Sequence, residues 1–310
     1  MAANYQRADF SPLRDGIYGV AAHWTTWTAP ASGTPRAFPD AVAHFDVPGF
    51  VKDIVATGAS HAAITLSHAL QWLPCPHPVV EKILPGRTCR RDLVGEIADA
   101  LASEGVKLML YYHHDLDAPD LDPEWRRATG ADEPGRHRFY QNLCGILKYL
   151  GEQYGKRTMA YWFDAGWALA ADPKCPWADI TAAAKAGNPD RLVTYNASID
   201  SLNFLTEYQD YFAGETEGFD LVPNGPVGPG GLPWHCYGTW YRARATAAWG
   251  IEVGNENFPR VPPTPDTVVE WIEKYRAVGG AVTLNALIHQ EGRLYPPDIA
   301  VMRGVKERLR

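Results

Sequence analysis

The stretch of sequence that decides the fold is MAYWFDAGW, residues 159–167. Its first half is an unbroken apolar run in which Tyr161, Trp162 and Phe163 combine bulk with high β-propensity. Such a run predicts a strand buried on both faces. The run stops at Asp164, and in a barrel of parallel strands the carboxyl end of a strand is where catalytic residues lie. Asp164 is therefore a candidate catalytic residue, with capping of the following turn as the alternative.

Strand-like and helix-like segments alternate along the rest of the chain. We expect strands at residues 16–24, 61–66, 106–112, 159–163, 191–196, 208–212, 234–238 and 281–286. We expect helices at about 46–55, 91–101, 137–154, 178–187, 267–278 and 297–309. A strand followed by a helix, repeated with few hairpin signals, predicts an α/β fold. We expect one (β/α)8 TIM-like barrel that spans residues 1–310 as a single domain.

Composition excludes several classes of partner. The net charge is −7 and no block of Lys and Arg occurs, whereas nucleic acids and anionic membranes require a basic face. The sequence has no apolar run long enough to span a bilayer and no N-terminal signal peptide, so we expect a cytoplasmic protein. The 11 Trp and 15 Tyr favour a carbohydrate ligand, because aromatic rings stack on sugars. The five cysteines show no zinc or disulfide spacing.

Polar and aromatic residues gather where the expected strands end. They are His23, Trp24, His68, Tyr112, His113, His114, Trp162, Asp164, Asn196 and Glu215. Glycoside hydrolysis requires two carboxyl groups, of which one is ionised beside the sugar and the other is protonated beside the leaving oxygen. Asp164 and Glu215 provide such a pair, with imidazoles to bind hydroxyls and aromatic rings to stack on the sugar.

Several segments resemble, in order along the chain, the α-L-fucosidases of glycoside hydrolase family 29. They are GIYGVAAHWTTW, FDVPGFVKDIVATGASHAAITLSH, RRDLVGEIADALASEGVKLMLYY, AYWFDAGW, DYFAGE and VGGAVTLNALIHQEGRLYP, and they span about residues 9–309. The resemblance implies a retaining glycosidase with Asp164 as the nucleophile and Glu215 as the acid/base. It implies no metal and no other cofactor. The residues expected to line the sugar pocket are His23, Trp24, His68, Tyr112, Trp162, Asn196 and Trp234.

The chain departs from the family pattern at two positions in the expected pocket. Two adjacent histidines usually follow the second strand, and here the first of them is replaced by Ser67. A Trp-Glu pair that is usual near the seventh strand is Trp234-His235 here, which leaves Glu215 as the better acid/base. We also expect no C-terminal β-sandwich, although that domain is common in the family. We expect a terminal α-L-fucoside or a related deoxy-sugar glycoside as the substrate, and an enzyme that is either compact or a homo-oligomer.

Three alternatives stay open at this point. Glu207 and Glu217 compete with Glu215 for the acid role. A metal-dependent barrel hydrolase would use His and Asp side chains at strand ends as ligands; these would be His23, His68, His113 and Asp164. A non-catalytic carbohydrate-binding protein on a glycosidase scaffold would account for the departures from the family pattern.

Overall fold

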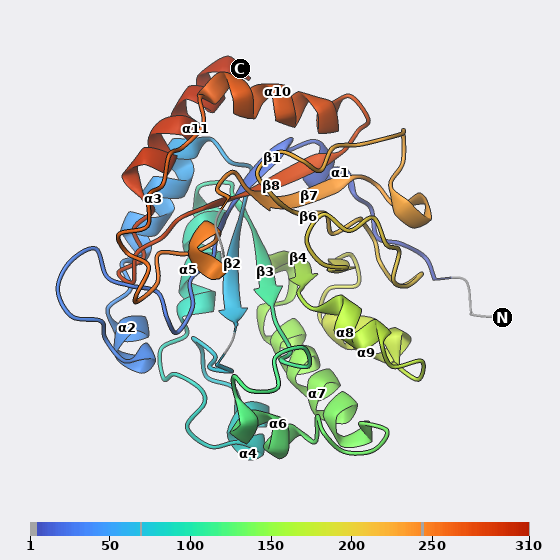
Figure 1. Ribbon diagram of the computed structural model, residues 1–310. Coiled ribbons are helices and arrows are strands. Elements are labelled where there is room, and N and C mark those ends of the chain that lie inside the picture. The colour runs from blue at the N-terminus through green and yellow to red at the C-terminus, as the bar shows by residue number, and fades with distance from the viewer. Residues whose placement is uncertain (1–4, 69, 243–244, 310) are drawn as a thin grey trace.

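Eight parallel strands and the helices that connect them make up the structure, a computed structural model that describes residues 5–68, 70–242 and 245–309 (Figure 1). The strands are β1 (Tyr18–Ala22), β2 (His61–Ser67), β3 (Lys107–Tyr112), β4 (Thr158–Phe163), β5 (Leu192–Tyr195), β6 (Glu215–Glu217), β7 (His235–Thr239) and β8 (Ala281–Ala286). The α-helices are α1 (Ser11–Arg14), α2 (Phe38–Ala43), α3 (Val47–Thr57), α4 (Pro78–Ile83), α5 (Leu93–Ser103), α6 (Pro123–Thr129), α7 (His137–Tyr154), α8 (Gly166–Ala170), α9 (Trp177–Ala184), α10 (Pro265–Arg276) and α11 (Pro296–Arg308).

The strands form one curled sheet in the order β5-β4-β3-β2-β1-β8-β7-β6, and every pair is parallel. Helices such as α3, α5, α7 and α10 lie outside the curl, as Figure 1 shows. All the carboxyl ends of parallel strands point to one rim, so the loops that follow the strands meet there. The expected α/β architecture with eight parallel strands is confirmed.

Local signals in the sequence explain where the helices begin. The Asp46 carboxylate accepts a hydrogen bond from the Gly49 amide at 3.0 Å and caps α3, and Pro48 lies in the first turn. Asp92 caps α5 in the same way, through the Gly95 amide at 2.9 Å. These caps satisfy amides at the helix start that have no partner within the helix.

The core has an inner and an outer part, because successive residues of a strand face opposite sides of the sheet. The outer part packs the sheet against the helices. The inner part lies within the curl and combines small side chains with large ones; it contains Ala21, Ala63, Met109, Tyr111, Ala160, Trp162, Tyr211 and Tyr237. The large rings of this inner part lie toward the carboxyl ends of the strands and leave room for a cavity there.

The sixth strand is not where we expected it. The expectation was residues 208–212, whereas β6 is Glu215–Glu217. Residues 210–214 instead lead into β6 and bond to β5 and β7: the Asp210 amide donates to the Val193 carbonyl of β5 at 2.8 Å, and the Tyr237 amide of β7 donates to the Gly214 carbonyl at 3.0 Å. The aromatic residues of 208–212 have the β-propensity of a strand. Their backbone hydrogen bonds, however, go to two different segments, from Asp210 to Val193 and from Phe212 to Pro233, and do not form one ladder.

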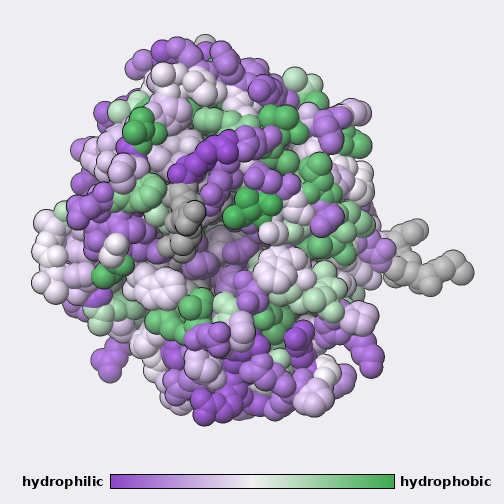
Figure 2. Space-filling model, viewed as in Figure 1, coloured by the Kyte–Doolittle hydropathy of each residue, from purple (hydrophilic) through white to green (hydrophobic). Residues whose placement is uncertain are grey.

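The outer surface is mostly hydrophilic in the view of Figure 2, with apolar residues scattered over it. Among the residues that the structure describes, no helix combines the length and the hydropathy needed to cross a bilayer.

The buried carboxylate of Asp210 predicts a large loss of stability on substitution. It accepts hydrogen bonds from the amides of Val193 and Ala8, each at 2.8 Å, and pairs with Lys185 Nζ at 2.8 Å. Asp210→Ala would leave the Lys185 charge unpaired within the protein. We expect the free energy of unfolding to fall by about 3–5 kcal/mol, measured by urea denaturation. The exposed Asp190 is the matched control, and Asp190→Ala should change stability by less than about 0.5 kcal/mol. Equal stability of the two variants would contradict the structural role of Asp210.

Candidate active site

A small cavity of about 60 Å³ lies at the carboxyl ends of the strands. Its lining residues are His23, His68, Tyr111, Trp162, Asp164, Glu215, Tyr237 and Trp249. They come from β3, β4, β6 and β7 and from the segments that follow β1, β2, β4 and β7, so residues far apart in the sequence meet at one point. A water molecule needs roughly 10–15 Å³ of such space, so the cavity holds a few waters or part of one small ring.

Asp164 lies directly after β4, and its backbone continues the strand pairing: its amide donates to the Tyr112 carbonyl at 2.9 Å. The next residue, Ala165, has φ of +53°, which turns the chain sharply and aims the Asp164 carboxylate into the cavity. Its Oδ1 accepts from the Ala165 amide at 2.7 Å, and its Oδ2 accepts from the Tyr111 hydroxyl. Helix α8 has no side-chain cap, so Asp164 does not serve as its cap.

Asn196, directly after β5, connects the two carboxyl groups of the cavity. Its Nδ2 donates to Asp164 Oδ1 at 2.9 Å and to Glu215 Oε2 at 2.6 Å. Because both bonds start from the same nitrogen, the two acceptor oxygens are at most about 5.5 Å apart. The structure thus brings together three residues that the sequence analysis singled out from three separate strand ends.

The two carboxyl groups differ in their electrostatic setting. Burial raises the pKa of Glu215 well above its ordinary value, and the negative charge of Asp164 adds to this rise. The hydrogen bond from Asn196 opposes it but does not cancel it. Asp164 accepts three hydrogen bonds, from the Tyr111 hydroxyl, the Ala165 amide and the Asn196 side chain. The site is therefore arranged to hold one carboxylate and one carboxylic acid side by side.

The two competing glutamates lie elsewhere. Glu207 is exposed in a turn before residues 210–214. Glu217 follows Glu215 by two residues on β6, but its Oε1 accepts a hydrogen bond from Trp249 Nε1 at 3.0 Å and it does not line the cavity.

Four aromatic rings form one wall of the cavity as a continuous stack. Tyr111 stacks on Trp162 with ring centroids 5.3 Å apart, Trp162 on Tyr237 at 4.5 Å, and Tyr237 on Trp249 at 6.1 Å. The angles between neighbouring ring planes are 19°, 26° and 22°. Trp162 Nε1 also donates to the Ala213 carbonyl at 3.1 Å, which connects the stack to the segment before Glu215. Flat rings in this arrangement offer an apolar surface to a sugar.

Two imidazoles lie on another side of the cavity. The rings of His23 and His68 are 4.6 Å apart, and each lies near Tyr111. Burial lowers the pKa of His23 to about 4 and that of His68 well below its ordinary value. Neutral imidazoles offer one donor and one acceptor each. The buried Nδ1 of His68 has no hydrogen-bond partner among the described residues, so this side chain has capacity left for a ligand.

A family model described as α-L-fucosidase matches residues 41–307, which is most of the chain. The chain belongs to the α-L-fucosidase family. The resemblance found in the sequence is therefore confirmed, and with it the expectation of a glycosidase. No curated protein sequence matches the chain.

Solved structures share the fold of this α-L-fucosidase family member at low sequence identity. α-L-Fucosidase isoenzyme 1 from Paenibacillus thiaminolyticus has 18% identity and a TM-score of 0.68, over 96% of this chain and 75% of that one. A family 29 α-L-fucosidase from Bacteroides thetaiotaomicron, trapped as a covalent intermediate, has 17% identity and a TM-score of 0.67, over 99% of this chain and 76% of that one. The endo-fucoidan hydrolase MfFcnA4 of glycoside hydrolase family 107 has 16% identity and a TM-score of 0.68, over 96% of this chain and 54% of that one.

Four residues that we expected in the sugar pocket of this family member do not line the cavity. One of them, Asn196, still contacts both carboxyl groups, whereas the other three pack away from the cavity. Tyr112 packs outward against Phe163 in the outer core. Trp24 packs against aromatic rings of the outer core, and its Nε1 donates to the Gln290 carbonyl at 3.1 Å. Trp234 lies in the same outer core, and its Nε1 donates to the Gly225 carbonyl at 2.9 Å. These side chains are on the helix-facing side of their strands or loops, so these three expectations are corrected.

The sequence analysis missed Tyr111, Tyr237 and Trp249. Tyr111 pairs in register with Trp162 across β3 and β4, so both rings point inward, whereas Tyr112 pairs with Phe163 and points outward. Strand alternation, counted back from Asp164, predicts which side chains of β4 point inward. For β3, the inward side chains follow only from the register of its pairing with β4. Tyr237 is the register partner of Glu215, and Trp249 comes from a loop for which the sequence offers no spacing rule.

The metal-hydrolase alternative needs a cluster of ligands. In the described ranges, no group of three or more His, Cys, Asp or Glu side chains has an arrangement that could hold a metal ion. His113 instead pairs with Asp117, with Nε2 and Oδ1 2.9 Å apart.

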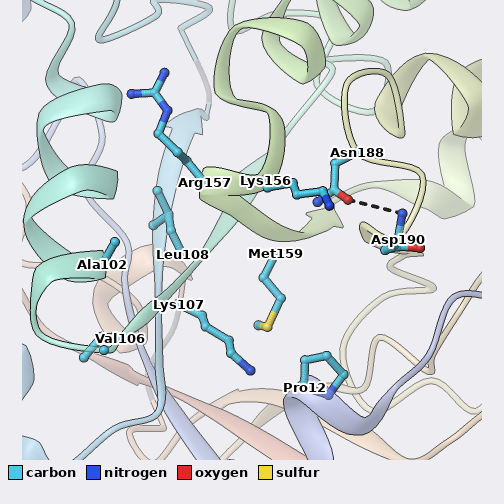
Figure 3. Close-up of a pocket in the computed structure, with 11 residues that line it drawn as sticks. Pro12, Ala102, Val106, Lys107, Leu108, Lys156, Arg157, Met159, Asn188 and Asp190 are labelled. Carbon is cyan, nitrogen blue, oxygen red and sulfur yellow. Dashed lines mark hydrogen bonds between the residues drawn. The ribbon is translucent and has the colours of Figure 1, made fainter.

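A larger cavity of about 440 Å³ lies at the opposite end of the strands (Figure 3). Lys107, Met159 and Pro12 lie around it, and Asp190 is its single carboxylate. It contains no carboxyl pair and no stack of rings, so the smaller cavity at the carboxyl ends is the candidate active site.

The raised pKa of Glu215 predicts a pH-dependent effect of Glu215→Gln on stability. As pH rises above the ordinary value of 4.5, the unfolded chain releases this proton before the folded protein does, so wild-type stability falls. Glutamine carries no such proton. The stability of Glu215→Gln relative to wild type should therefore increase with pH, with a slope of up to about 1.4 kcal/mol per pH unit, measured by urea denaturation between about pH 4 and pH 8. Glu207→Gln is the exposed control and should show a flat difference.

Proposed function

We propose that this chain hydrolyses terminal α-L-fucosides, or glycosides of a closely related deoxy sugar, with retention of the anomeric configuration. The observation that carries the proposal is the bridge from Asn196 to both Asp164 and Glu215, with bonds of 2.9 and 2.6 Å. Retaining glycosidases keep their two carboxyl groups about 5–5.5 Å apart, and the bridge keeps the facing oxygens no more than about 5.5 Å apart. Family membership supports the sugar class.

In the proposed first step, the Asp164 carboxylate attacks the anomeric carbon while the bond from that carbon to the leaving oxygen breaks. Glu215, held protonated by burial and by the charge of Asp164, gives its proton to the leaving oxygen. The product is a sugar ester of Asp164. In the second step, Glu215 as carboxylate takes a proton from a water molecule, whose oxygen attacks the same carbon and releases Asp164.

The other cavity residues bind and orient the sugar in this proposal. His23 and His68 are neutral, and Nδ1 of His68 has no partner among the described residues, which suits hydrogen bonds to hydroxyl groups. Trp162 and Tyr237 offer ring faces to apolar C–H groups of the sugar. Ser67 does not supply a replacement for an imidazole in the cavity, because its Oγ donates to the Gln71 side chain and the His113 carbonyl, both at 3.0 Å. Sugar hydroxyls on that side are therefore left to His68.

The size of the cavity favours an exo-acting enzyme. An endo-acting hydrolase such as the structurally similar endo-fucoidan hydrolase cleaves within a polymer and needs a cleft with several sugar sites. The cavity here is compact, at about 60 Å³, and ends in the stacked rings. A single terminal sugar is the ligand that such a pocket suits.

We also propose that the curled sheet closes as a (β/α)8 barrel and that residues 1–310 act as one catalytic domain. The bonds of residues 210–214 support closure, because this segment leads into the edge strand β6 and its Asp210 amide bonds to the other edge strand, β5. Thr194 Oγ1 adds a hydrogen bond to the Tyr211 carbonyl at 2.6 Å. Closure matters for the reaction, since it fixes Glu215 relative to Asn196.

Azide rescue tests the roles of the two carboxyl groups on an aryl α-L-fucoside. Asp164→Ala should reduce kcat by about 10³-fold or more, and azide should then give the β-fucosyl azide through a single inversion. Glu215→Ala should lose about 10²–10⁴-fold on a poor leaving group but little in the first step on dinitrophenyl fucoside, which needs no proton. Azide should then give the α-fucosyl azide, because Asp164 still acts first. The anomeric configuration is read by NMR.

Glu207→Ala is the control and should keep wild-type kcat, since its side chain is exposed away from the cavity. Near-wild-type activity of Glu215→Ala on a fucoside with a poor leaving group would show that another group is the acid. Binding of fucose by the wild type without turnover of any aryl glycoside would favour the carbohydrate-binding alternative. Loss of activity in a chelator, restored by a metal ion, would favour the metal hydrolase.

A further inference from the structure

Trp249 forms the outer end of the ring stack, yet it does not belong to a strand. It follows a short 3-10 helix, Ala245–Ala248, in the long connection between β7 and β8. Its side chain is half-buried and lines the cavity beside Glu215 and Asp164. A loop residue is less constrained than a strand residue, so its position depends on the contacts that fix it.

Three strands supply those contacts. From β6, Glu217 Oε1 accepts a hydrogen bond from Trp249 Nε1 at 3.0 Å. From β8, Asn285 Nδ2 donates to the Trp249 carbonyl at 2.8 Å. From β7, Tyr237 stacks on the indole ring at 6.1 Å and 22°. The indole is thus held at its nitrogen, at its backbone and on its face.

Glu217 is placed for this contact by strand alternation. It lies two residues after Glu215 on β6, so both side chains leave the strand on the same side. Glu215 meets Asn196 and the cavity, whereas Glu217 lies one step further along the strand and meets the indole N–H instead. A partly buried carboxyl group is costly to leave without a hydrogen bond, and Trp249 satisfies it.

We propose that Glu217 is a positioning residue that fixes Trp249 as the outer wall of the sugar pocket and so contributes to substrate affinity rather than to proton transfer. This inference rests on the proposed function for its substrate. Without Glu217, the indole would sample several rotamers, and part of the binding free energy would be used to order it again. Loss of Glu217 should therefore change KM and inhibitor affinity more than kcat, because Trp249 does not contact the proton that is transferred.

Four variants test the contact: Glu217→Ala, Glu217→Gln, Trp249→Phe and the double variant Glu217→Ala/Trp249→Phe. Loss of one hydrogen bond to a charged group should raise KM for an aryl α-L-fucoside by about 5–30-fold with kcat changed less than about threefold. Glu217→Gln keeps an oxygen acceptor and should stay near the wild-type KM. The double variant should be no worse than the more affected single variant, because both substitutions remove the same bond.

Each variant is also titrated with an iminocyclitol of fucose configuration by calorimetry, with Glu207→Ala as the exposed control. The dissociation constants should follow the pattern of the KM values. This arm does not need turnover, so it separates the two proposals. A wild type that binds the iminocyclitol but hydrolyses no aryl glycoside would refute the proposed function and leave the role of Glu217 measurable.

Two results would overturn the inference. In the first, Trp249→Phe binds substrate and iminocyclitol as tightly as the wild type. In the second, Glu217→Gln loses about 10²-fold or more in kcat and azide restores turnover as the α-fucosyl azide, which would make Glu217 the acid/base. Both tests use conservative variants: Trp249→Phe keeps an aromatic ring, and Glu217→Gln keeps the size of the side chain. They can therefore be carried out even if Glu217→Ala fails to fold.

Discussion

The hydrogen bonds from one amide nitrogen of Asn196 to two carboxyl groups are the constraint on which the site depends. Two carboxylates at this distance repel each other, and burial strengthens the repulsion. The Asn196 amide, as a shared hydrogen-bond donor, reduces this repulsion. A proton retained on Glu215 removes most of the remaining repulsion. The pair therefore stays together only with unequal protonation, which is the condition that double displacement at a glycosidic centre requires.

The position of Asn196 depends in turn on how the sheet is held together between β5 and β6. These two strands share no ladder of hydrogen bonds. Residues 210–214 span the gap through backbone bonds, and the buried carboxylate of Asp210 fixes the start of that segment to β5 and to Lys185. An interaction remote from the cavity thus sets the distance between Asn196 and Glu215.

The cavity owes its shape to unequal side-chain sizes inside the curl. Small residues such as Ala21, Ala63 and Ala160 let neighbouring strands approach, and large rings from β3, β4 and β7 occupy the end nearest the loops. The stack forms one wall of the pocket, and the loop residue Trp249 completes it.

The sequence alone was enough to predict the alternation of strands and helices, the carboxylate at the end of β4 and the family. Each of these follows from local propensity, from short spacing or from ordered similarity. Tertiary structure alone decided which ring of Tyr111 and Tyr112 faces the cavity, that residues 210–214 join two strands instead of forming one, and that Glu215 rather than Glu217 meets Asp164. The physical reason is that strand register and closure depend on hydrogen bonds between segments far apart in the chain, and a shift of one residue in a strand exchanges its two faces.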